Sequence, residues 1–375
     1  IKRGARYYRD SEKKKYKQMG WDKIRRRTES KSMNKLRFGL IGCGNIARKH
    51  VEALRIDSAT LIACCDTDMY KAQELGAKND IIAYNNYDAM LNCEALDVVC
   101  ILTPNGLHKE HVIDIASKYN VDIICEKPLA LTKSDAEQMI EACNKANVKL
   151  FVVKQNRFNK PVERLIIASN VGRFGKLVLG TVRVRWMRLQ DYYSKSNWHG
   201  TKNIEGGILW NQASHHIDLL LRIMGKPKKF NLMTAKRVLD VETEDVAIAN
   251  IEFESGALGI IECVTATRPK DLEGSISILG DCGTVEIAGF ALNEIRTWKF
   301  NNYLPIDEEL FMRRCYSEEP ADIYGNSHKR YIAKVVDCIE NNKTREELGL
   351  PTDEECLQVV EFIEKLYQIK EKNNA

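Results

Sequence analysis

The sequence lacks several features that mark whole classes of protein. No apolar run approaches the roughly 20 residues that a membrane-spanning helix needs. The basic N-terminal stretch has no apolar centre, so it does not have the pattern of a secretory signal peptide. The 12 cysteines include no Cys-x-x-Cys pair and stand singly or as Cys64-Cys65, which favours reduced, buried thiols. We therefore expect a cytoplasmic protein.

A general basic surface is also missing, although the net charge is +5. Residues 1–32 carry 13 basic and 4 acidic residues, whereas the rest carries 44 basic and 48 acidic residues. The body is thus mildly acidic, and no nucleic-acid partner is expected. The lysine- and arginine-rich opening has no sustained apolar periodicity, which predicts a disordered extension over 1–32. The alternative is a tether to nucleic acid or to an acidic surface.

Residues 33–153 alternate between strand-like and helix-like runs. This alternation predicts an α/β fold with a doubly wound parallel sheet. Thr132, just before an amphipathic stretch, is predicted to cap the N-terminus of a helix. The expected strands are Leu36–Ile41, Thr60–Cys65, Val98–Leu102, Val121–Cys125 and Lys149–Val153, and the expected helices include His108–Tyr119 and Asp135–Ala146.

After about residue 175 the pattern changes to consecutive strands joined by short loops. Such strands, without crossover helices between them, predict a second, α+β domain over 154–326 with a large, mostly antiparallel open sheet. The C-terminal part, 327–375, contains two helix-like stretches that are expected to pack back on the body. The expected strands are Leu177–Arg188, Val246–Glu254, Gly256–Thr267, Ser275–Leu279 and Gly283–Ile287.

The first expected strand ends in Gly42-Cys43-Gly44-Asn45-Ile46-Ala47, and a helix-like stretch follows. The second strand ends at Asp66, 19 residues after Ala47. This spacing is typical of a Rossmann dinucleotide-binding domain, in which glycines allow a tight turn and a close approach of the pyrophosphate. An ordinary glycine turn is the alternative. Asp66, followed by Thr67 and not by Arg, favours ribose hydroxyls and therefore NAD over NADP.

Two further loops are expected at the carboxyl edge of the same sheet, where the cofactor crevice lies. One loop holds Thr103-Pro104-Asn105, and the next holds Glu126-Lys127-Pro128. Lys127 could act as a general acid or base, because burial and a cationic cofactor ring would lower its pKa. A solvated loop lysine is the alternative.

A segment of the second domain is also rich in polar side chains. Asn211, His215 and Asp218 stand at positions i, i+4 and i+7 of a predicted helix, so they are expected on one side of it. A structural histidine is the alternative interpretation. No metal site is expected, because His215 and His216 point to different faces and His108 and His111 lack further ligands nearby.

The link between the domains contains Lys154-Gln155-Asn156-Arg157. Basic groups at this place would suit an anionic substrate. A salt bridge at the domain interface is the alternative for Arg157.

Taken together, these motifs resemble those of the glucose-fructose oxidoreductase/inositol dehydrogenase (Gfo/Idh/MocA) family. The glycine-rich turn, Thr103-Pro104-Asn105 with His108, Glu126-Lys127-Pro128 and the Gly-Gly…His-x-x-Asp segment ending at Asp218 occur in the family's order over about residues 35–370. Further segments, including Trp198-His-Gly-Thr201 and Asn211-Gln-Ala-Ser-His215, look like the subgroup of UDP-N-acetylglucosaminuronate 3-dehydrogenases. Asn211 stands where many family members have Asp.

The resemblance implies NAD-dependent oxidation of the 3-hydroxyl of a UDP-linked N-acetylated uronic sugar, in the synthesis of surface polysaccharide. Lys127 and His215 match the family's acid/base pair, and which of them is the proximal base stays open. The implied cofactor-binding residues are Gly42, Gly44, Asn45, Ile46, Ala47, Asp66, Thr103, Pro104, Asn105, His108, Glu126, Lys127 and Gln155. The implied substrate-binding residues are Lys127, Lys154, Asn156, Arg157, Trp198, Asn211, Gln212 and His215.

Alternatives remain at this stage. The substrate could be another sugar or a cyclitol, or the chain could bind NAD without catalysing a reaction. The resemblance also suggests 2-oxoglutarate as a possible hydride acceptor and a homodimer or homotetramer as the assembly.

Overall fold

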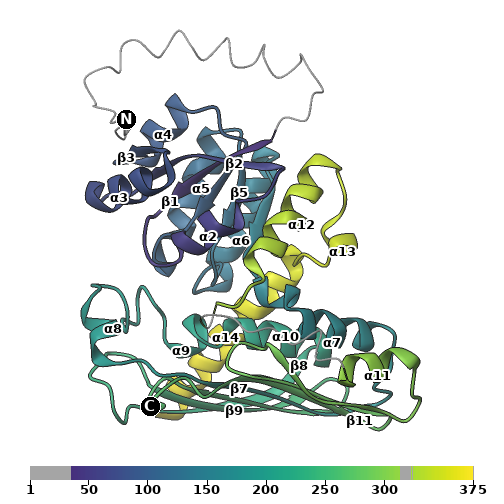
Figure 1. The fold of residues 1–375 in the computed structure, drawn as a ribbon. Helices are drawn as coiled ribbons and strands as arrows, with labels where there is room; N and C mark the ends of the chain where they lie inside the picture. The colour runs from purple at the N-terminus through teal and green to yellow at the C-terminus, as the bar shows by residue number, and fades with distance from the viewer. Residues whose placement is uncertain (1–34, 313–321, 323, 375) are drawn as a thin grey trace.

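The computed structural model describes residues 35–312, 322 and 324–374, which form two sheets with helices packed against them (Figure 1). The expectation for residues 1–32 concerns a segment outside the described residues. Among the described helices, none is long and apolar enough to cross a membrane.

The first sheet is parallel and has six strands, as expected from the alternating pattern. Its central strands are apolar on both faces because helices cover both, and every residue of the strand Val98–Ile101 is buried. The strands lie in the order β3(Ile82–Tyr84), β2(Ala59–Cys65), β1(Leu36–Ile41), β4(Val98–Ile101), β5(Asp122–Cys125) and β6(Leu150–Val152). Its helices are α2(Ala47–Ala53), α3(Met69–Asn79), α4(Tyr87–Cys93), α5(His108–Lys118) and α6(Lys133–Ala146). As predicted, the Thr132 side chain caps α6 by accepting a hydrogen bond from the backbone N–H of Asp135.

The second sheet has seven strands and confirms the mostly antiparallel prediction. Within the described strands, the neighbours β7 and β10 run parallel and the other neighbouring pairs run antiparallel. The order is β13(Glu294–Phe300), β12(Gly283–Ala288), β11(Glu273–Gly280), β7(Leu177–Arg185), β10(Leu258–Val264), β9(Val246–Phe253) and β8(Pro227–Ala235). The strands β3, β8 and β13 were not predicted from the sequence.

Helices cover the face of the second sheet that looks toward the first sheet (Figure 1). α10(Ser214–Met224) packs on β7 and β11, and α14(Asp353–Asn374) packs on β8. The other face carries exposed apolar side chains, among them Met233 and Leu258. The remaining helices of this part are α7(Lys160–Asn170), α8(Gln190–Ser194), α9(Ile208–Asn211) and α11(Pro305–Met312).

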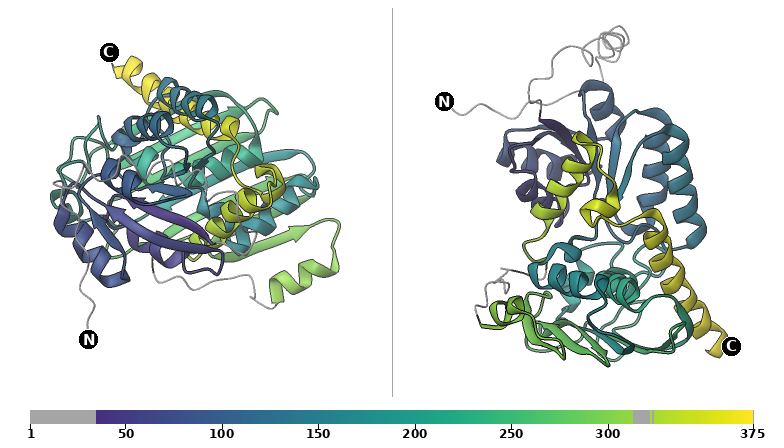
Figure 2. Two further views of the ribbon diagram at one scale, coloured as in Figure 1. Left: turned by 90° about the horizontal axis from the view of Figure 1, so that it is seen from above. Right: turned by 90° about the vertical axis from the view of Figure 1, so that its right-hand side faces the viewer.

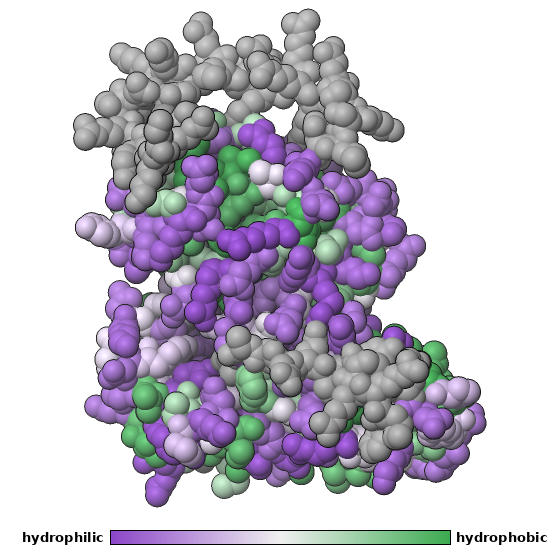
Figure 3. All heavy atoms as spheres, viewed as in Figure 1, coloured by the Kyte–Doolittle hydropathy of each residue, from purple (hydrophilic) through white to green (hydrophobic). Residues whose placement is uncertain are grey.

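The C-terminal helices pack against both sheets' layers (Figure 2). α12(His328–Glu340) lies on α2, and α14 contacts α6 as well as α10, with the short α13(Arg345–Leu348) between them. The loops at the carboxyl edge of the parallel sheet face the second domain. Asn105 Nδ2 donates to the backbone oxygen of Glu205 at 3.1 Å, and Gly106 N donates to that of Ile204 at 3.0 Å. Polar side chains gather where the two layers meet (Figure 3).

Candidate active site

The glycine-rich turn after β1 has the conformation that a dinucleotide phosphate requires. Gly42 has a φ of +101°, and a Cβ there would lie 2.7 Å from the carbonyl oxygen of Leu102, so only glycine fits. A Cβ at Gly44 would meet no described atom within 4 Å, so this position opens onto free space. Ile46 stands at the N-cap of α2 and makes no side-chain capping bond. The turn therefore fits a pyrophosphate at the start of α2.

Asp66 lies beside this turn at the end of β2. Its Oδ2 accepts from the backbone N–H of Cys43 at 2.8 Å, and its Oδ1 accepts from that of Asp68 at 2.9 Å. The carboxylate is thereby fixed next to the turn, where it would accept bonds from ribose hydroxyls and repel a 2′-phosphate.

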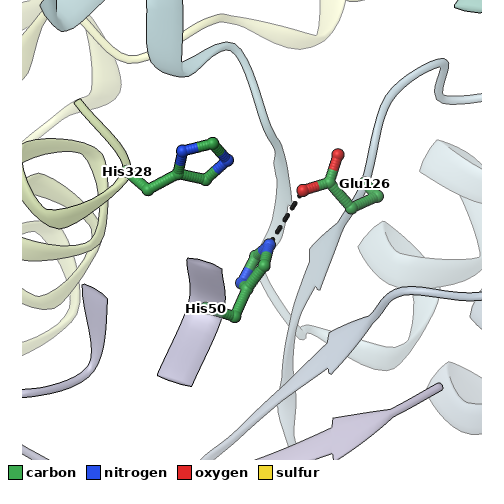
Figure 4. A group of neighbouring side chains, drawn as sticks. All are labelled: His50, Glu126 and His328. Carbon is green, nitrogen blue, oxygen red and sulfur yellow. Dashed lines mark hydrogen bonds and ion pairs between the residues drawn. The ribbon is translucent and has the colours of Figure 1, made fainter. Parts of the chain in front are cut away.

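Glu126, expected to contact the cofactor, points instead toward α2 and α12 (Figure 4). His50 Nε2 donates to its Oε1 at 2.8 Å, and the backbone N–H of Lys127 donates to its Oε2 at 3.1 Å. Burial would raise the pKa of Glu126, but the bond from His50 and the charges of His50 and Lys127 lower it to about 2. Both oxygens are engaged within the protein, so Glu126 anchors the loop that carries Lys127.

His50, Glu126 and His328 offer ligand atoms within 4.8 Å of one another, the spacing of a potential metal site (Figure 4). The bond between His50 and Glu126 already uses two of these atoms. Burial lowers the pKa of His328 to about 3, so its ring is neutral beside the pair. A hydrogen-bonded pair next to a neutral imidazole accounts for the cluster, and the absence of a metal stays a prediction.

His108 and Asn105 both make hydrogen bonds within the protein. His108 is fully buried; its Nδ1 lies 2.7 Å from the oxygen of Pro128 and its Nε2 lies 2.9 Å from that of Thr103. Asn105 is bonded to Glu205 across the domain boundary, as described above. These bonds hold the two loops in place. Both ring nitrogens of His108 are used within the protein, whereas the direct cofactor contact expected of Asn105 stays a prediction.

Lys127 is held against Asn211 between the two domains and is not a solvated loop lysine. Its Nζ lies 2.6 Å from the backbone oxygen of Asn211 and 3.2 Å from the side-chain Oδ1 of the same residue. Burial lowers the pKa of Lys127 to about 8, with a further lowering by Lys154 and Arg188, while Glu126 and Glu205 oppose the shift. At pH 7 roughly a tenth of the amine is therefore neutral, and the neutral fraction rises to about half at pH 8, which suits a general base that works near neutral pH.

The expected single helix carrying Asn211, His215 and Asp218 is wrong. α9 ends at Asn211 and α10 begins at Ser214, so the spacing of i, i+4 and i+7 does not set a common side. His215 is buried, and no partner for its Nδ1 is found in the described part of the chain. Burial, followed by the charges of Lys127 and Lys154, lowers the pKa of His215 well below its ordinary value. The imidazole is therefore neutral and lies in the field of the Lys127 amine.

Arg157 matches the salt-bridge alternative, so its expected role in binding a substrate anion is corrected. Its Nε and Nη2 donate to the two carboxylate oxygens of Asp218, each at 2.8 Å, and its Nη1 donates to Glu355 at 2.7 Å. Each guanidinium nitrogen thus serves a carboxylate, and the group is 2% exposed. Lys154 is also buried, with its Nζ 3.8 Å from Asp218.

The remaining candidates are Gln155, Asn156, Gln212 and Trp198. Asn156 is buried, and so are Gln155 and Gln212, each of which has a side-chain oxygen without a protein partner among the residues described. Trp198 is half-buried and stacks on His199, with ring centroids 3.8 Å apart.

Sequence reasoning missed a group of residues between β7 and α9. The Arg188 guanidinium lies over the Tyr192 ring, 5.3 Å from its centroid. Its positive charge contributes to lowering the pKa of Lys127. Glu205 is 1% exposed, and burial raises its pKa to about 7. No short motif marks these positions, and their proximity to Lys127 depends on the packing of the two domains.

Family models match both parts of the chain. The "Oxidoreductase family, NAD-binding Rossmann fold" model matches residues 36–154, and the "GFO/IDH/MocA C-terminal domain" model matches residues 166–286. The first match confirms the expected NAD-binding Rossmann domain. A D-apiose dehydrogenase of Paraburkholderia graminis is 30% identical over 63% of this chain, and the matched region spans 62% of that enzyme, slightly less than two thirds.

Two solved structures resemble nearly the whole chain. The WlbA dehydrogenase of Bordetella pertussis, in complex with NADH and UDP-GlcNAcA, is 34% identical with a TM-score of 0.85, covering 91% of this chain and 96% of that one. The WlbA dehydrogenase of Chromobacterium violaceum, with the same two ligands, is 35% identical with a TM-score of 0.82, covering 90% and 94%.

Proposed function

Since the chain belongs to the GFO/IDH/MocA family of NAD-binding oxidoreductases, we propose that it oxidises the 3-hydroxyl of a UDP-linked N-acetylated uronic sugar. The two WlbA structures, which contain UDP-GlcNAcA and NADH and match about nine tenths of the chain, support this choice of substrate. A role in making surface polysaccharide follows from the same resemblance.

The observation that carries the proposal is the position of the Lys127 amine. A neutral amine has two N–H groups and one lone pair. The two oxygens of Asn211, at 2.6 and 3.2 Å from Nζ, can accept both N–H bonds and leave the lone pair for the substrate hydroxyl. With a pKa of about 8, Lys127 suits a base that works near neutral pH.

We assign Lys127 as the proximal base and His215 as an orienting group. When bound, the nicotinamide ring supplies the acceptor for the hydride of the carbon that carries the hydroxyl. Lys127 takes the hydroxyl proton as that hydride leaves. His215 has a pKa far below its ordinary value, so its ring stays neutral and acts by hydrogen bonding to the sugar.

The negative charge of the substrate needs a cation that is not neutralised by carboxylates. Arg188 meets this need better than Arg157, because its ion pair with Asp271 is looser, at 3.5 Å, and its Nη1 donates to the backbone oxygen of Met187 at 2.7 Å. The charge of Arg188 also lowers the pKa of Lys127. The unpartnered oxygens of Gln155 and Gln212 suit donors from the cofactor and the sugar. Lys154, Asn156 and Trp198 stay proposed contacts of the substrate.

The direct test is an assay of purified protein with NAD and UDP-GlcNAcA, with and without 2-oxoglutarate. We expect NADH and a 3-keto sugar, both absent from the Lys127→Met variant. The substrate assignment is wrong if the wild type leaves UDP-GlcNAcA unchanged while it oxidises inositol or a free sugar. Light scattering of the same sample tests the proposed dimer or tetramer.

A further inference from the structure

Glu205 is a buried carboxyl group that the proposed mechanism does not use. It lies between α8 and α9, only 1% of it is exposed, and it has no role in the motifs found in the sequence. Burying a carboxylate is costly unless it is hydrogen-bonded, so its contacts explain its position.

The contacts of Glu205 lead to the amine of Lys127 in two steps. One carboxylate oxygen, Oε2, accepts from the backbone N–H of Gly200 at 2.6 Å. The other, Oε1, accepts from the side-chain Nδ2 of Asn211. The same amide offers its Oδ1 to Lys127 Nζ at 3.2 Å. The amide is thereby fixed with its nitrogen toward the carboxylate and its oxygen toward the amine.

We propose that Glu205 is a positioning residue that holds the Asn211 amide, and through it the Lys127 amine, in the orientation needed to receive the substrate proton. Without the carboxylate, the Asn211 amide could rotate and present its NH₂ group to the lysine. A donor would then face the two N–H groups of the amine, and the lone pair would turn away from the substrate.

The charge of Glu205 interacts electrostatically with the amine of Lys127. Lys127 faces it from the loop after β5, Glu244 from the loop before β9, and Tyr192 and Tyr193 from α8. Burial raises the pKa of Glu205 to about 7, while the bonds from Gly200 and Asn211 and the charge of Lys127 oppose the rise. At pH 8 the group is mostly ionised, and it then favours the protonated form of Lys127.

Two variants distinguish the effect of the charge of Glu205 from the effect of its side-chain length. Glu205→Gln keeps an oxygen for Asn211 but removes the charge. Glu205→Asp keeps the charge but is shorter by one methylene group and loses the contact with Asn211. The matched control is Glu242→Gln, because Glu242 is an exposed carboxylate that accepts from the backbone N–H of Lys202 and has no bond to Asn211.

The first readout is the pH dependence of acetylation of Lys127 by acetic anhydride, followed by peptide mass spectrometry on the cofactor-free protein. In Glu205→Gln we expect the midpoint to move to lower pH by about one to two units, the effect of one unit charge roughly 6–12 Å away at an effective dielectric constant of ~20. Glu205→Asp and Glu242→Gln are expected to keep the wild-type midpoint. Because this readout needs neither cofactor nor sugar, a wrong substrate assignment leaves it intact.

The second readout is kcat at high pH, where Lys127 is neutral in every variant. This part rests on the proposed role of Lys127 as the base. We expect a fall of at least tenfold for Glu205→Asp, and no further fall when Glu205→Asp is added to Asn211→Ala, because the effect passes through that amide. KM for NAD is expected to stay unchanged.

The inference is overturned if folded Glu205→Gln keeps the wild-type midpoint, or if folded Glu205→Asp keeps the wild-type kcat. It is also overturned if the losses in Glu205→Asp and Asn211→Ala add independently. If thermal unfolding shows that Glu205→Gln does not fold, the comparison of Glu205→Asp with Asn211→Ala decides the question alone.

Discussion

Lys127 is half-buried and Arg157 is buried; both cations lie near the domain boundary, yet their surroundings differ. Each nitrogen of Arg157 donates to a carboxylate of Asp218 or Glu355. Lys127 Nζ lies instead against two neutral oxygens of Asn211. The first arrangement cancels charge and fixes structure, because a buried charge is stabilised mainly by a matched partner. The second gives the amine no bonded carboxylate among the described residues, so burial lowers the pKa of the lysine, against the charges of Glu126 and Glu205, and prepares it for proton transfer.

The largest expected effect is on the chemistry at Lys127. Lys127→Met removes the proposed base but keeps a similar side-chain length, so kcat is expected to fall by about 10²–10⁴. The variant should melt at the wild-type temperature or above it, because a buried charge without a carboxylate partner has been removed. Initial rates and a thermal melt measure both effects. Wild-type turnover in a folded Lys127→Met protein would refute the catalytic assignment.

The converse effect is expected at Arg157, where stability should suffer. Asp218→Asn leaves the guanidinium without its bidentate partner in a buried place, and the free energy of unfolding is expected to fall by about 3–5 kcal/mol. Denaturant unfolding measures the change. Glu141→Gln is the control, because it breaks an exposed ion pair with Lys145 and should leave the midpoint unchanged. An equal midpoint for Asp218→Asn would show that Arg157 is not held by this pair.

The pH dependence of turnover should reflect Lys127. Its pKa is lowered to about 8, and only the neutral amine accepts a proton, so kcat/KM for alcohol oxidation should rise about tenfold per pH unit below pH 8 and level off above it. A profile of initial rates across this range, at fixed ionic strength, provides the measurement. A profile that is flat through pH 8 would argue against a neutral lysine as the base.

The pH dependence of stability should reflect the Arg157 cluster, with the smallest effect of the four. Burial would raise the pKa of Asp218, but Arg157 and Lys154 lower it. A carboxyl with a lowered folded pKa contributes stability above its unfolded pKa of about 4 and loses it as the pH falls through the folded value. Unfolding midpoints measured below pH 4 should therefore fall more steeply in the wild type than in Asp218→Asn. Parallel curves would contradict this linkage.

Lys127 and Arg157 also show which features of the site could be predicted from the sequence. The loop of Lys127 was predictable because a buried strand and three adjacent residues define it locally. For Arg157 a salt bridge was one of two alternatives, but its partners could not be predicted, because Asp218 and Glu355 are 61 and 198 positions away and only the packed fold brings them together. Glu205 was not predicted for the same reason, because its proposed role depends on the Asn211 amide that bonds both Glu205 and Lys127.

The missed strands have a shared physical cause. β3, β8 and β13 are edge strands of their sheets. An edge strand needs no continuous apolar run and tolerates charges and proline, as β8 illustrates with Pro227 followed by two lysines. The central strands, buried on both faces or alternating clearly, were predicted within a few residues of their ends.

The most direct test of the central claim is a crystal structure with NADH and the UDP-linked sugar. We expect Lys127 Nζ to lie about 3 Å from the 3-oxygen of the sugar while it keeps its contacts with Asn211. A complex in which that oxygen faces another side chain, with the Lys127 amine out of hydrogen-bonding reach, would contradict the account.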